Sequence, residues 1–193
     1  MRARNIVVIL AGMLVTGAPG RTPGAPERQW FWASTQFGYG VLDKSSDQET
    51  HNQQGTFAMA LDLGLTLNHH VRVGVQLNGW LLESYNVWDP AKGESVSQAF
   101  VITQVYPWSD CNAFVKAGVG RATYSNSGPL EFGSSGWGQT IGVGYDWPLG
   151  RGVSLTSTIN YSQGGLGDVH NVLVTIYDRR YRVFDVGVGL TYR

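Results

Sequence analysis

Along almost the whole chain after residue 29, apolar side chains stand at every second position, with small or polar side chains between them. This alternation is the strongest constraint that the sequence sets on the fold. In the clearest stretch, 57–67, Phe57 and Met59 begin an apolar face, while Ala58 and Asp62 belong to a small or polar one. Successive side chains of a β-strand point to opposite faces of the sheet, so this pattern predicts strands. No segment after residue 29 shows the apolar period of a helix, and we expect an all-β fold.

Eight segments carry the alternation. The best-defined connection between two of them is 68–70, because only a three-residue loop that pairs Leu67 with Val71 puts the apolar faces of both segments on the same side. The segments therefore predict an antiparallel up-and-down arrangement. We expect strands at 30–42, 54–67, 71–83, 96–106, 112–124, 137–149, 153–163 and 181–192.

The connections between these segments alternate in length. Short connections are expected at 68–70, 107–111 and 150–152, and long ones at 43–53, 84–95, 125–136 and 164–180. An even number of strands then puts all short turns and both termini at one rim, which is typical of transmembrane β-barrels.

The composition of the two faces indicates whether the barrel is surrounded by water or by lipid. The polar face consists mainly of Gly, Ser, Thr and Asn with isolated charges, and only 15% of all residues are charged. Such a face is a poor solvated surface but a good lining for a narrow barrel. Aromatic residues also gather near both predicted rims, including Tyr106 and Trp108 at one and Tyr124 and Trp137 at the other, as membrane interfaces favour. Trp80 belongs to the expected inner face, so we expect it to fill the lumen. We expect an eight-stranded antiparallel up-and-down transmembrane β-barrel.

The N-terminus has the pattern of a secretory signal peptide. Arg2 and Arg4 precede a short apolar run, 6–15, and small residues follow. The run is too short to cross a bilayer as a helix. We expect a signal peptide over 1–18, with cleavage as late as about residue 25, a flexible lead-in over 19–29 and a barrel over 30–193.

Four motifs resemble the bacterial outer-membrane-protein β-barrel domain family, the small barrels that include OmpA-like and OmpW-like proteins. They are Tyr106-Pro107-Trp108 and the segments 113–120, 142–146 and 186–192. The resemblance implies a location in the outer membrane, both termini in the periplasm, insertion by the barrel-assembly machinery and a monomer. Such barrels usually end on an aromatic residue, whereas here Arg193 follows Tyr192. We still expect assembly, because the terminal strand alternates as required.

Isolated polar and charged side chains are expected to face the lumen. A narrow barrel is filled by its own side chains, and an unpaired charge inside it is costly, so a structural hydrogen-bonded network is favoured over a transport path. The residues predicted for this network are Asp62, Arg72, Gln76, Lys116, Asp146 and Asp185.

The last long connection contains a second candidate site. Val172, Val174 and Ile176 alternate there, which predicts an extension of the hairpin above the membrane. Arg179, Arg180 and Arg182 follow and are expected to contact lipopolysaccharide phosphates. The alternative is an exposed strand edge that pairs with a partner.

Other chemistry finds little support in the sequence. A net charge of zero gives no electrostatic reason to expect a nucleic-acid partner, and the single Cys111 cannot form an intramolecular disulfide. His69 and His70 diverge in a turn and lack further ligands at suitable spacing. We therefore expect no metal and no cofactor.

Some small barrels modify lipids with a His followed two residues later by a nucleophilic Ser. Here the residue two positions after His170 is Val172, so the nucleophilic Ser of that motif is absent. Ser162 together with His170 is the remaining candidate for a catalytic pair. We expect a non-enzymatic barrel with an envelope-structural, surface-interaction or small hydrophobic ligand role. The alternatives are a surface adhesin, a narrow channel for small hydrophobic molecules, a rim-site lipid A-modifying enzyme and a soluble periplasmic lipid-binding barrel.

Overall fold

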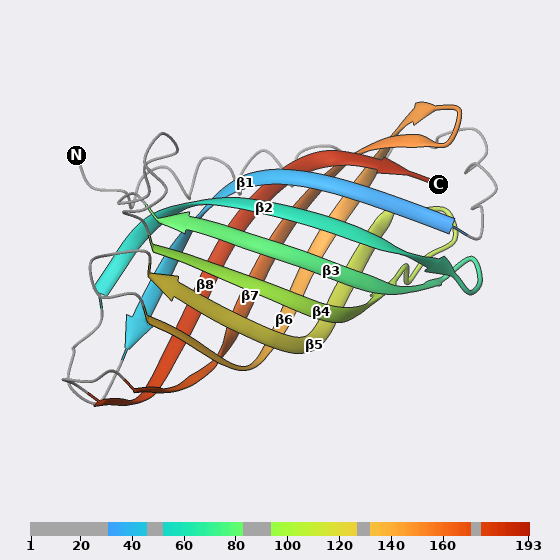
Figure 1. The fold of residues 1–193 in the computed structure, drawn as a ribbon. Coiled ribbons are helices and arrows are strands. Elements are labelled where there is room, and N and C mark those ends of the chain that lie inside the picture. The colour runs from blue at the N-terminus through green and yellow to red at the C-terminus, as the bar shows by residue number, and fades with distance from the viewer. Residues whose placement is uncertain (1–30, 46–51, 83–93, 127–131, 171–174) are drawn as a thin grey trace.

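The computed structural model is a closed barrel of eight antiparallel strands, in which each strand pairs with the next and β1 pairs with β8 (Figure 1). It describes residues 31–45, 52–82, 94–126, 132–170 and 175–193, so the expected signal peptide and lead-in lie outside the described residues. The predicted fold class is confirmed. None of the described residues forms a helix long and apolar enough to cross a membrane. The strands are β1 (Phe31–Ser45), β2 (Asn52–Thr66), β3 (Val71–Leu82), β4 (Glu94–Val105), β5 (Ala113–Asn126), β6 (Phe132–Gly150), β7 (Val153–His170) and β8 (Thr175–Tyr192).

The apolar face of the strands lies on the outside of the barrel. Leu61 and Leu63 are 42% and 44% exposed, whereas Asp62 between them is 0% exposed. A water-soluble barrel has the inverse arrangement, with apolar side chains inside and charges outside. The burial pattern is that of a barrel surrounded by lipid.

The short turns follow local chemistry. In the β2–β3 turn, the Leu67 amide donates to the carbonyl of Val71 over 2.9 Å, which confirms the predicted three-residue loop. The Asn68 side-chain oxygen accepts bonds from the amides of His70 and Val71. Asn side chains stabilise turns in this way because they mimic a backbone carbonyl.

The β6–β7 turn is tighter than predicted, because β6 continues to Gly150 and only Arg151 and Gly152 connect it to β7. These two residues have φ values of 48° and 81°, the left-handed conformation of a two-residue hairpin. A bulge between Pro148 and Gly150 takes up the residue that would otherwise shift the register.

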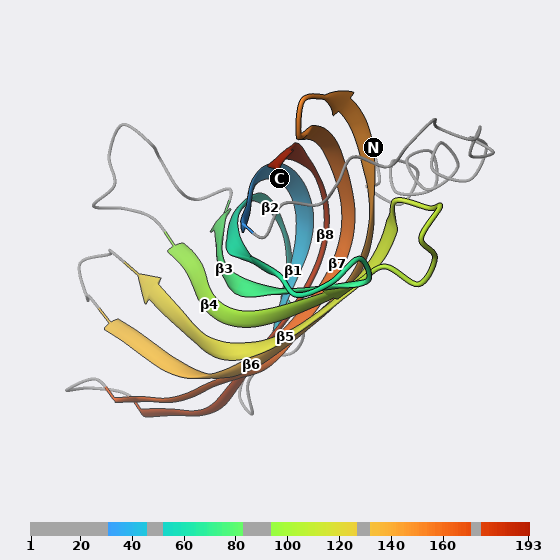
Figure 2. The same ribbon diagram turned by 90° about the vertical axis from the view of Figure 1, so that its right-hand side faces the viewer.

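Three strands extend five or more residues beyond the bounds that the sequence pattern predicts. β6 begins at Phe132 rather than at 137, β7 reaches His170 rather than 163, and β8 begins at Thr175 rather than at about 181. Most of the connection predicted at 164–180 is therefore a hairpin of β7 with β8, whose strands lie beside the end of β6 at the lower left of Figure 2. Alternation does not predict these extensions, because backbone hydrogen bonds can pair two strands even where neither face of the hairpin is apolar. Val172 and Val174 lie outside the described residues.

Glycines on the inner face make room for large aromatic side chains. A Cβ added at Gly138 would clash with the Tyr181 hydroxyl, and one at Gly144 would clash with the ring of Phe114. Narrow barrels need such alternation of small and large side chains to fill their interior.

Candidate functional site: a filled lumen and an outer groove

Asp146 is the centre of a buried polar cluster at the short-turn end of the lumen. Its carboxylate accepts hydrogen bonds from Tyr106 Oη at 2.8 Å and from Thr156 Oγ1 at 2.7 Å. Arg72 Nη1 and Arg193 Nη2 lie 3.6 and 3.7 Å from Asp146 Oδ2. A carboxylate with this many donors is well compensated for the loss of water, so the cluster stabilises the barrel end that it closes.

Arg193, the residue that departs from the usual terminal aromatic, lies inside the barrel. Tyr192 points outward, so the next side chain points inward and is 2% exposed. There it donates to Ser154 Oγ, while its backbone amide donates to the carbonyl of Gly152 over 2.8 Å. The lumen role of Arg193 was not predicted, although the alternation of the last strand already indicated its direction.

The four other predicted lumen residues form a second cluster further along the barrel. Gln76 donates to Asp62 over 2.8 Å, and Asn160 donates to Asp185 over 2.8 Å. Lys116, which is 1% exposed, interacts electrostatically with both carboxylates. The structure thus places all six predicted residues on the inner face and divides them into two groups, which alternation alone does not indicate.

Tyr106 and Tyr124, predicted at the rims, are buried inside the lumen instead. Trp80 is buried in the lumen as predicted, and Trp108 and Trp137 are exposed on the outside as predicted. Tyr106 was placed in the outer belt by its distance from the turn, but it continues the inward-facing positions of β4. Its hydroxyl bridges Arg72 and Asp146 there.

The long-loop half of the lumen is filled by large side chains. Gln98 donates to the hydroxyl of Tyr181, which packs in one buried cluster with Trp80, Tyr124 and Leu166. The cavity beside Trp80 and that beside Tyr124 each measure about 10 Å³. A space of this size holds at most about one water molecule. These two cavities offer no path for a solute.

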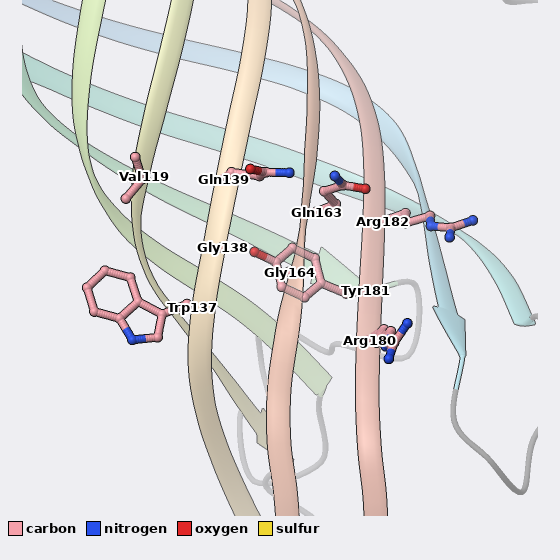
Figure 3. A pocket seen from close by; sticks show the side chains of 9 residues that line it. All are labelled: Val119, Trp137, Gly138, Gln139, Gln163, Gly164, Arg180, Tyr181 and Arg182. Carbon is pink, nitrogen blue, oxygen red and sulfur yellow. The ribbon is translucent and has the colours of Figure 1, made fainter.

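A much larger hollow lies on the outside of the barrel, near the long-loop rim. It measures about 570 Å³. Figure 3 shows its lining side chains on β5 to β8, with Gln139, Gln163 and Arg182 at one level on adjacent strands. Arg180 and Arg182, predicted to contact phosphates, both line it, while the side chain of Arg179 lies outside the described residues. We call this hollow the outer groove, with Val119, Trp137, Gln139, Gln163, Arg180 and Arg182 as its principal residues.

The other chemistry-bearing residues are engaged elsewhere. The ring Nδ1 of His70 lies 2.8 Å from the carbonyl oxygen of Tyr106. Within the described ranges, no three His, Cys, Asp or Glu side chains are close enough to hold a metal ion. Ser162 is buried in the lumen and donates to Thr140 over 3.0 Å, so its hydroxyl cannot reach a lipid at the outer rim. The side chain of His170 lies outside the described residues.

A closed eight-stranded antiparallel barrel with an apolar exterior and a polar interior is the fold of the small OmpA/OmpW-like outer-membrane β-barrels. No family model and no curated protein matches the sequence.

Among solved structures, the chain is similar to three outer-membrane barrels. Neisserial surface protein A aligns with a TM-score of 0.54 and 15% identity over 84% of this chain and 96% of that one. The outer membrane protein AlkL aligns with a TM-score of 0.51 and 15% identity over 92% of this chain and 96% of that one. The attachment invasion locus protein Ail of Yersinia pestis aligns with a TM-score of 0.50 and 10% identity over 85% of this chain and 99% of that one. At these identities the likeness concerns the fold.

Proposed function

We propose that this protein is an integral, non-enzymatic barrel of the bacterial outer membrane that acts through its outer surface and long-loop end rather than through its lumen. The observation that carries the proposal is the inverted polarity of the wall: Leu61 and Leu63 face outward while Asp62 is fully buried. Only a surrounding apolar solvent makes such an arrangement favourable along a whole barrel. The fold shared with three outer-membrane proteins supports the same location.

The filled interior supports a structural or surface role over transport. Buried ion pairs close one half of the lumen, and Trp80, Tyr124 and Tyr181 occupy the other. The two interior cavities of about 10 Å³ are too small for a hydrophobic ligand.

The short turns and both termini belong on the periplasmic side in this proposal, with the long connections outside the cell. We expect export by the signal peptide at 1–18, insertion by the barrel-assembly machinery and a monomeric product. The shared position of the short turns and of the end of β8 at one rim is the geometry that this route requires.

The test combines heat-modifiability on a detergent gel with outer-membrane fractionation after a carbonate wash, using cells that express the full chain. We expect a band that changes mobility between unheated and boiled samples and that stays with the outer membrane. A soluble periplasmic protein whose mobility does not change on heating would contradict the proposal and favour a soluble lipid-binding barrel.

A surface adhesin is the second candidate. It is favoured by the β7–β8 hairpin, whose pairing continues to His170 and Thr175, whereas β1 ends opposite Arg180. An edge of this kind carries backbone groups that can pair with another chain.

A further inference from the structure

We propose that the outer groove binds lipid A, the phosphorylated and multiply acylated anchor of lipopolysaccharide, with a phosphate at Arg180 and Arg182 and an acyl chain along Val119 and Ala117. The inference rests on the proposed function, because it needs the long-loop rim to lie in the outer leaflet. It goes beyond a general attraction of arginines to phosphates, since it assigns both a headgroup site and a chain site.

At the polar end of the groove, the strand register puts three hydrogen-bond donors, Gln139, Gln163 and Arg182, in one row beside Val119. Val119 pairs with Gln139, Gln139 with Gln163, and Gln163 with Arg182, so these four side chains lie side by side on the outer face. Figure 3 shows the two amides and the guanidinium of Arg182 at one level, with Arg180 displaced from them along β8. Guanidinium groups bind phosphate in a bidentate manner, and amide groups add further donors.

The apolar end of the groove is formed by small outward-facing side chains. A hollow of about 720 Å³ shares Val119 and Trp137 with the outer groove and continues along Ala99, Ala117 and Thr103. Its end toward the long-loop rim also contains Arg121, which pairs with Trp137. A second, of about 380 Å³, also contains Val119 and Ala117 and runs toward β7. The three hollows meet at Val119, so one surface joins a cationic end, at Arg121, Arg180 and Arg182, to two arms that become apolar away from the long-loop rim.

The change in polarity falls between two adjacent rows of the barrel wall. One outward position further from the long-loop rim, the row reads Ala117, Ile141, Tyr161 and Phe184, and it contains no charge. A membrane interface is expected where apolar side chains give way to polar ones, and exposed Trp137 beside this step is typical of such an interface. A ligand that spans the step must have an anionic head and an apolar chain.

Lipid A fits this surface better than a phospholipid does. Two arginines on one strand suit a glycolipid with more than one phosphate, and two apolar arms suit a ligand with several chains. Asp43, the cross-strand neighbour of Arg182, opposes an anion and sets a limit to the affinity. Its removal should therefore strengthen binding.

The proposal can be tested by native mass spectrometry of the protein purified in detergent and freed of co-purified lipid. The probes are bis-phosphorylated lipid A, dephosphorylated lipid A and phosphatidylglycerol. We expect the wild type to bind one bis-phosphorylated lipid A and the R180A/R182A variant to bind it at least about tenfold more weakly, because charge-assisted bonds to phosphate are lost. R151A, which removes an arginine from the opposite rim, is the matched control and should change the affinity less than about twofold.

Two further variants address the chain site and the opposing charge. A117L fills the apolar arm and should weaken binding about fivefold, whereas A113L, on the same strand and face but outside the hollows, should not. D43N should strengthen binding about threefold. Every variant must retain its heat-dependent mobility, so that lost binding cannot be confused with misfolding.

Equal losses in R180A/R182A and R151A, or equal binding of dephosphorylated lipid A, would overturn the headgroup assignment. Phosphatidylglycerol binding as tightly as lipid A and with the same dependence on Arg180 and Arg182 would overturn the choice of lipid A. A protein that is heat-modifiable and remains in the outer membrane but binds no lipid A would overturn this inference alone and leave the proposed function intact.

Discussion

At the scale of single residues, the barrel depends on matched pairs of small and large side chains inside the wall. Gly138 and Gly164 lie against the hydroxyl of Tyr181, which accepts a bond from Gln98. These glycines are needed for space, since their φ values lie outside the left-handed region that other residues avoid. A side chain at Gly138 would have to displace the buried Tyr181 hydroxyl, and one at Gly164 would also meet the backbone of Trp137 and Gly138.

Gly138→Ala is expected to lower the free energy of unfolding by about 1–3 kcal/mol, because the new Cβ clashes with the Tyr181 hydroxyl in a packed interior. Urea unfolding in detergent measures the change. Gly79→Ala, where an added Cβ meets nothing within 4 Å, is the control and should change stability by less than about 0.5 kcal/mol. In a Tyr181→Phe background the cost of Gly138→Ala should fall, and an unchanged cost would contradict the steric explanation.

Arg193→Ala is expected to lower the free energy of unfolding by about 1–3 kcal/mol, because Asp146 loses one of its two ion-pair partners and Ser154 loses a donor. The same urea experiment applies. Arg151→Ala removes an equal charge from the adjacent exposed turn and should be nearly neutral. Equal effects of the two substitutions would show that the buried position of Arg193 is not important.

At the scale of elements, one part of the β7–β8 hairpin belongs to the barrel wall, and its tip extends beyond the wall. Residues up to Leu166, which is buried in the lumen, belong to the wall. Beyond Gly165 the register shifts at two bulges, and the pairing of β7 with β8 continues to His170 and Thr175, past the last pair of β1 with β8 at Ser45 and Arg180. Closure of the barrel therefore does not depend on the tip.

Replacement of residues 168–178 by Asn-Gly is expected to leave the barrel heat-modifiable, because Gly167 and Arg179 already pair and a two-residue turn fits that register. The detergent-gel assay measures folding, and adhesion of expressing cells to a host-cell or matrix surface measures the role of the tip. Loss of adhesion in a folded variant would support the adhesin candidate. A barrel that no longer folds would show instead that the tip is needed for assembly.

At the scale of the whole molecule, two filled layers close the lumen, and the outer groove and its two arms lie outside it. Asp146, Arg72 and Arg193 close the short-turn half, and Trp80 with Tyr181 closes the other. The outer groove and its two apolar arms measure hundreds of Å³, against about 10 Å³ for the cavities at Trp80 and Tyr124.

Planar-bilayer recordings of the purified protein are expected to show no stable ionic conductance, because both layers exclude a continuous water path. A general porin reconstituted under the same conditions is the positive control. Reproducible open-channel steps with the wild type would contradict the closed lumen and return the narrow-channel alternative to consideration.

The sequence alone determined the class of fold and the two faces of its wall. Alternation such as Leu61, Asp62, Leu63 specifies a strand with one apolar side, and an even number of antiparallel segments puts both termini at one rim, because both follow from period and spacing along the chain. It also placed the six predicted polar residues on the inner face.

Only the tertiary structure decided which of those residues meet and what the outside can bind. The strands of Asp146 and Arg72 are far apart in the sequence, and their side chains meet because the barrel closes and its lumen is narrow. The outer groove depends on register across β5 to β8, where Val119 and Arg182 are brought into one row by backbone pairing. Period predicts the direction of a side chain, whereas register between strands determines its neighbours.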